Sequence, residues 1–142
     1  MKFSILLLVL VFLASESEGV AVDPPSALGP VWNHISLLME AVKQKDAEVV
    51  IQLFLSSEAD HNNVDRFLEV FQGQNIHVDS ATIQKDGTTI TSDIKIGDKF
   101  PATLTLVKCD SMTGLRITNI ASEKIGTGCA EGLLGCAIKV VE

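Results

Sequence analysis

The stretch LLMEAVKQKDAEVVIQLF, residues 37–54, decides how we interpret the fold of this chain. It holds the end of one amphipathic helical pattern, an interruption at KQKD, and the start of a second helical pattern. Asp46 has the short acceptor side chain that caps a helix, and apolar residues recur at helical spacing on both sides of it. The stretch therefore predicts two consecutive helices whose apolar faces build a core.

The helical pattern extends in both directions from this pair. A core-facing helix is predicted at residues 31–44, because Pro30 presets the backbone angle of a helix start. The polar segment SSEADHNN is expected to interrupt the helices, with Asn63 as the next cap and Gly73 as the next helix end. Between these two residues lies a third apolar stripe, made of Val64, Phe67, Leu68 and Phe71.

After residue 74 the apolar period changes from that of a helix to that of a strand. Four alternating segments joined by short turns predict an antiparallel meander, with a hairpin turn at KDG, residues 85–87. The alternation shifts parity near Asp79 and Ser80, which predicts a β-bulge there. The last segment, residues 123–142, has four glycines between residues 126 and 135 and no clear period. We expect this segment to be a loop-rich tail.

The first residues have the pattern of a secretory signal peptide. A basic start is followed by an apolar run of twelve residues and by SESEG, which predicts residues 1–19 as the leader, with cleavage after Gly19 or, alternatively, after Ala21. Such a run covers about 18 Å as a helix, whereas a bilayer core is about 30 Å thick. We therefore expect a secreted protein without a membrane anchor after cleavage, with residues 20–30 as an extended lead-in.

The charge of the chain excludes two classes of partner. Its formal net charge is −7, and no basic run occurs. Nucleic acids and anionic lipids are bound by patches of lysine or arginine that neutralise phosphates. Neither class is expected as the main partner.

Three cysteines, Cys109, Cys129 and Cys136, would meet an oxidising compartment after secretion. They allow one internal bridge in three ways, and the remaining thiol is then free or joined to another chain. A bridge between Cys129 and Cys136 would close a small loop, while Cys109 with Cys129 is an alternative.

The stretch EAVKQKDAEVVIQLF resembles the helix pair of the NTF2-like (cystatin-like α+β cone) superfamily, and more narrowly that of small secreted NTF2-like proteins of nematodes. The matching positions are Ala41, Val42, Lys45, Asp46, Val50, Leu53 and Phe54. The segment GDKFPATLTLVK is similar to the central sheet strand of that family. The resemblance covers residues 31–122. It implies an α+β domain whose N-terminal helices pack into a curved antiparallel sheet, forming a cone with an apolar mouth.

Enzymes of that superfamily project Asp, His and Tyr side chains into the cone, and isomerase-type members need a tyrosine hydroxyl at the oxyanion. This chain contains no tyrosine, which argues against such chemistry. The remaining catalytic candidates are His34, beside the apolar stripe of the first helix, and His77 with Asp79, two residues apart on one strand. The alternative to catalysis is structural: His34 would lie at the edge of the apolar stripe, and His77 and Asp79 would lie on a strand face exposed to solvent. We accordingly expect replacement of His34 to leave folding almost unchanged.

Asp60, His61 and Asp65 lie close together in the sequence, but short polar residues between helices are expected for capping and turn formation alone. They lack the ligand spacing and central glycine of an EF-hand loop. No cofactor or metal site is predicted.

These observations leave three hypotheses. The first is a secreted, non-enzymatic NTF2-like domain that binds a small apolar ligand or a protein partner, with a homodimer through the sheet face as one form of partnership. The second is a degenerate isomerase or hydrolase that uses His34 or His77 with an Asp. The third is a structural extracellular protein linked to another chain by its odd cysteine.

Overall fold

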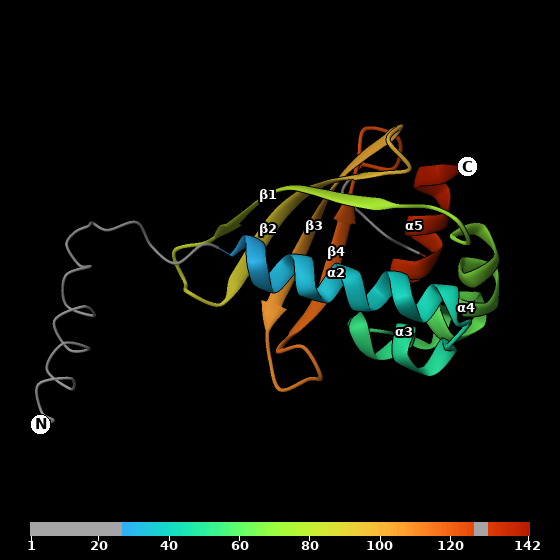
Figure 1. The fold of residues 1–142 in the computed structure, drawn as a ribbon, viewed down its shortest axis with the longest axis horizontal. Coiled ribbons are helices and arrows are strands. Elements are labelled where there is room, and N and C mark those ends of the chain that lie inside the picture. Colours follow the sequence, from blue (N-terminus) through green and yellow to red (C-terminus); the bar gives the residue numbers. More distant parts are fainter. Residues whose placement is uncertain (1–26, 127–130) are drawn as a thin grey trace, which may run out of the picture.

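The structure is a computed structural model that describes residues 27–126 and 131–142. Within these ranges the chain has the expected α+β class, with helices preceding an antiparallel sheet and one further helix following it (Figure 1). The helices are α2 (Leu28–Lys43), α3 (Ala47–Leu53), α4 (Glu58–Val70) and α5 (Gly132–Val141). The strands are β1 (Ile76–Ile83), β2 (Thr89–Ile96), β3 (Phe100–Lys108) and β4 (Leu115–Ala121). The predicted leader lies outside the described residues.

The predicted helix pair is confirmed. Helix α2 starts three residues before the expected residue 31 and includes Pro30 in its first turn, where the missing N–H of proline removes no helical bond. Helix α3 begins directly after Asp46, whose Oδ1 accepts a hydrogen bond from the Val49 N–H at 3.2 Å. The cap therefore separates the two helices as the sequence indicates.

The start of α4 was predicted wrongly at Asn63. The helix begins at Glu58, because Ser57 and Asp60 form a capping box in which Asp60 Oδ2 accepts from the Ser57 N–H at 2.9 Å. The polar residues that suggested a loop form the first turns of this helix. Asn63 instead donates a hydrogen bond to the Ala59 carbonyl at 3.0 Å.

The sheet is a meander of strand order β1-β2-β3-β4, as predicted. The pairing of β1 with β2 shifts between Val78 and Ser80, which confirms the expected bulge. Alternate side chains of β2 are buried, and those between them are exposed or half-buried. The helices thus pack against one face of the sheet, with α2 running beside β1 (Figure 1).

Helix α5 replaces the loop-rich tail expected for residues 123–142. Its apolar residues Leu133, Leu134, Ala137, Ile138 and Val140 are buried in the same core as the other helices. Gly132 and Gly135, which obscured the helical period, allow close approach: a Cβ on Gly135 would lie 3.3 Å from Asn63 Nδ2 of α4. The described part of the C-terminal segment therefore belongs to the domain core.

Candidate functional site

His34 is fully buried, so it lies inside the core and not at the edge of the helical stripe. Its Nε2 is 3.0 Å from the Leu53 carbonyl oxygen, and its Nδ1 is 2.6 Å from Thr113 Oγ1. A carbonyl only accepts, so Nε2 carries the proton and Nδ1 accepts from the threonine hydroxyl. Burial lowers the pKa of His34, which keeps the ring neutral at pH 7. This geometry makes His34 a link between α2, α3 and the β3–β4 loop, and the expectation that its replacement spares folding is revised.

The structure does not bring His77 and Asp79 together as a pair. His77 is exposed on β1, and its Nε2 lies 3.2 Å from Asp98 Oδ1 in the β2–β3 turn. Asp79 is exposed at the bulge, where the regular alternation of side chains is broken. The partner of His77 therefore comes from a turn that its own strand does not indicate.

The polar residues Asp60, His61 and Asp65, which are close together in the sequence, do not form one site on α4. Asp60 is fully buried, whereas His61 and Asp65 are exposed. Among the described residues, no three His, Cys, Asp or Glu side chains are arranged to hold a metal ion.

Cys109 has a free, exposed thiol just after β3. Cys136 is buried in α5, and Cys129 lies outside the described residues. The bridge between Cys129 and Cys136 stays a prediction.

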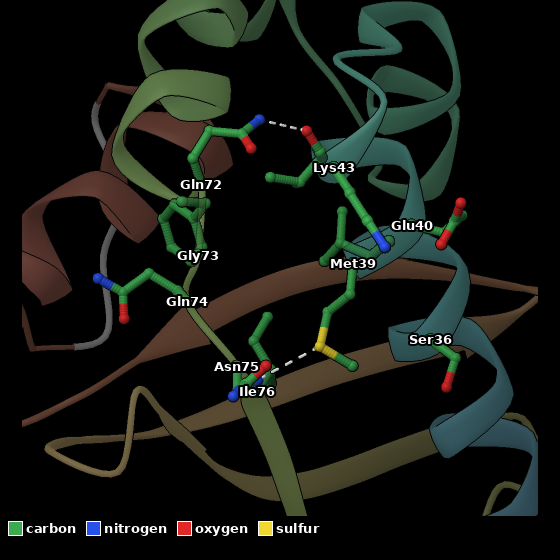
Figure 2. A pocket seen from close by; sticks show the side chains of 12 residues that line it. Ser36, Met39, Glu40, Lys43, Gln72, Gly73, Gln74, Asn75 and Ile76 are labelled. Atoms are coloured by element: carbon green, nitrogen blue, oxygen red, sulfur yellow. Dashed lines mark hydrogen bonds between the residues drawn. The ribbon is translucent and has the colours of Figure 1, made fainter.

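One cavity in the described part of the chain is an open groove between α2 and the connection from α4 to β1, which we name the α2–β1 groove (Figure 2). Its volume is about 430 Å³. Its floor is made of core side chains, each at most 5% exposed: Leu38, Val42, Phe71 and Ile76. Its rim is mostly polar and is formed by Ser36, Met39, Glu40, Lys43 and residues 72–75. An apolar floor under a polar rim is the usual composition of a small-molecule site.

Two contacts hold the connecting segment against α2 and so define this groove. The Gln72 side-chain amide donates a hydrogen bond to the Val42 carbonyl, and Met39 Sδ accepts from the Ile76 N–H at 3.4 Å (Figure 2). Gly73 has φ of +80°, a conformation that glycine adopts without the strain of a side chain, and it turns the chain after α4. The sequence indicated Gly73 as a helix end but gave no sign that the following turn borders a cavity.

A second groove, the Trp32 groove, lies toward the start of α2. It has a volume of about 410 Å³ and is lined by Leu28, Gly29, Trp32, His77 and Val78. Trp32 is 46% exposed and Leu28 is 42% exposed, so two large apolar side chains face solvent there. The two grooves share the side of the domain on which α2 lies beside β1.

The interior between the helices and the sheet is filled. The space left among its side chains, which include Ile35, Phe67 and Leu104, amounts to about 20 Å³. This is roughly the room for one water molecule and excludes an organic ligand from the core.

Comparisons with protein families, curated proteins and solved structures returned no match to this chain. Within the described ranges, no helix has both the length and the apolar character needed to cross a bilayer.

Proposed function

We propose that this protein is a secreted, non-enzymatic NTF2-like domain that binds a small apolar ligand in the α2–β1 groove. The secretion part rests on the signal-peptide pattern of residues 1–19. The NTF2-like part rests on the order of elements, helices before an antiparallel meander, together with the resemblance of residues 31–122.

The observation that carries the binding role is the contrast between the filled interior and the open groove. Ligand sites usually enclose about 300–1,000 Å³, and the α2–β1 groove offers about 430 Å³. The space of about 20 Å³ in the core is too small for such a ligand. The ligand would therefore lie at the edge of the domain, beside α2, and not in an inner cone.

At the α2–β1 groove the geometry favours binding over catalysis. A general base must reach the proton that it removes. His34 has both ring nitrogens engaged inside the core, and neither His34 nor His77 lines the α2–β1 groove. The isomerase or hydrolase hypothesis therefore gains no support from this site.

A protein partner is the second candidate, and the Trp32 groove favours it. Exposed tryptophan is enriched at interfaces because its large ring buries much area with little loss of freedom. A partner seated there would cover Leu28 and Trp32.

The binding role is tested with N-phenyl-1-naphthylamine, an uncharged apolar probe that fluoresces when shielded from water. We expect saturable enhancement of its emission with the parent protein. Met39→Glu places a charge on the groove wall and should weaken binding at least fivefold, since it adds the desolvation of a carboxylate. The matched control is Met112→Glu, because Met112 is 48% exposed and does not line the groove.

Circular dichroism and thermal unfolding of each variant would confirm that both are folded. Equal probe affinity in the parent and in folded Met39→Glu would contradict the assignment of this groove. If the probe fails to bind the parent, the small-ligand proposal is wrong, and binding at the Trp32 groove becomes the function to test.

A further inference from the structure

We infer that the α2–β1 groove takes an aliphatic carboxylate whose headgroup pairs with the Lys43 ammonium and whose chain lies along Met39 and Ile76. This inference rests on the proposed ligand-binding function and specifies the chemistry of the ligand. Three features of the groove support it: a cation that forms no ion pair among the described residues, a rim acid that has another partner, and an apolar floor.

The available cation is Lys43, in the last turn of α2. Its side chain runs along α2, and its ammonium lies above Met39 (Figure 2). The ion pairs among the described residues engage Arg66, His77 and Lys139, and none of them engages Lys43. An ammonium has three donors, so Lys43 can bind an anionic group that enters the groove.

The one acid on the rim does not compete for this cation. Glu40 extends to the far side of α2, away from the groove (Figure 2), and accepts a hydrogen bond from the Gln44 side chain. The other polar side chains on the opposite rim are the neutral carboxamides of Gln72, Gln74 and Asn75. The rim thus holds one acid, Glu40, whose carboxylate is engaged by Gln44, and one base, Lys43, with which an anionic headgroup would pair.

The apolar floor specifies the rest of the molecule. Beneath Lys43 the groove is lined by buried aliphatic and aromatic side chains, including Val42 and Phe71. Met39 adds an unbranched, polarizable side chain that adapts to flexible apolar ligands. A hydrocarbon chain attached to the anionic group would lie over this floor, with a gain in affinity of at most about fifteenfold for every two buried methylenes.

The test compares dodecanoate with dodecanol as competitors of N-phenyl-1-naphthylamine, both below the concentrations at which they aggregate. The two molecules share a chain and differ in the charged headgroup. We expect dodecanoate to bind the parent protein about fivefold more tightly than dodecanol, the upper range for one partly exposed ion pair. We also expect decanoate to bind more weakly than dodecanoate.

The decisive variant is Lys43→Gln, which removes the charge while keeping a side chain of similar length. It should abolish the preference for dodecanoate and leave dodecanol and probe binding unchanged. The matched control is Lys45→Gln, because Lys45 is exposed two residues further on and does not line the groove. That variant should retain the preference, and 1 M NaCl should reduce it in the parent.

Equal affinities for dodecanoate and dodecanol, or an unchanged preference in Lys43→Gln, would overturn the inference while the groove remains a site for uncharged apolar molecules. Loss of the preference in Lys45→Gln as well would also overturn it, because a general charge effect would then explain the result. If neither the probe nor dodecanoate binds the parent, the proposed function itself fails, and the inference fails with it.

Discussion

Replacing Asp60 with alanine tests how α5 is attached to the rest of the domain. The Asp60 side chain is fully buried. Its Oδ2 accepts from the Ser57 N–H at 2.9 Å and its Oδ1 accepts from the Leu134 N–H at 2.8 Å. One carboxylate therefore caps α4 and also binds the first turn of α5, 74 residues further along the chain.

The cost of the replacement can be estimated from these two bonds. Ser57 is exposed, so water can replace the lost partner of its N–H, and that loss resembles removal of a helix cap, about 1 kcal/mol. Leu134 is fully buried, so its N–H keeps no partner and costs about 1–3 kcal/mol. We expect Asp60→Ala to lower the free energy of unfolding by about 2–4 kcal/mol, the sum of these two effects.

Urea unfolding followed by circular dichroism would measure this change, and hydrogen exchange would locate it. Exchange should accelerate in α5 more than in the sheet, because Asp60 holds the start of that helix. Asp60→Asn keeps one acceptor oxygen and should cost less than Asp60→Ala. Asp65→Ala is the matched control, since Asp65 is an exposed acid on the same helix and should change stability by less than about 0.5 kcal/mol. A loss below that value in Asp60→Ala, or unchanged exchange in α5, would refute the reasoning.

Three further predictions follow from the core and the cysteines. Burial lowers the pKa of His34 below 6.5, so the unfolded chain takes up a proton at a higher pH than the folded chain does. The stability due to neutral His34 is therefore full above pH 6.5 and is lost as the pH falls toward the lowered pKa. The stability of His34→Gln, measured by urea unfolding, should depend less on pH in this range. Leu134→Ala should cost about 3–5 kcal/mol because Leu134 is fully buried; a cost below about 1 kcal/mol would show that α5 is not part of the core. Alkylation of the folded, unreduced protein should modify Cys109, which is free and exposed, and protect Cys129 and Cys136; mass analysis that found Cys109 protected would contradict this pairing.

The parts of the fold that were predicted from sequence are those with a local physical cause. Asp46 lies beside the helix that it caps, and the change of parity near Asp79 lies at the bulge itself. The short turns also bring neighbouring strands together, so the order of the sheet follows the order of the chain. In each case the residues that decide the structure are within a few positions of the feature.

Of the parts that were missed, the start of α4 has a local cause that was misinterpreted, and helix α5 depends on contacts between distant residues. The start of α4 was placed too late because Asp60 was interpreted as a loop residue, whereas its carboxylate closes a capping box. Helix α5 was missed because Gly132 and Gly135 usually weaken a helix, and only the close approach to α4 makes small residues suitable there. The apolar spacing of Leu134 and Ile138 was the signal that could have revealed it.

The candidate site was the hardest part to predict, for a related reason. His34 has the spacing of a stripe-edge residue, yet it is fully buried and its Nδ1 pairs with Thr113, 79 positions away. The α2–β1 groove combines one side of α2 with the connection after α4, and the hydrogen bond from Gln72 to the Val42 carbonyl joins them across 30 positions. No local sequence pattern indicates that these distant segments lie side by side.

The filled core itself explains why the proposed site lies at the edge of the domain. In a chain of this size, the buried side chains must pack closely to offset the entropy lost on folding, and an internal cavity large enough for a ligand would remove many of those contacts. The α2–β1 groove avoids that loss, because its floor is the outer surface of side chains, such as Leu38 and Phe71, that already pack inward. The proposed ligand would lie against half-buried Met39 and above floor side chains that the fold already buries almost completely, with Lys43 at the rim as the proposed partner of its headgroup. Enlarging the groove from outside, for example by Met39→Ala, should therefore change ligand affinity more than stability, whereas truncation of Phe71 in its floor should lower both.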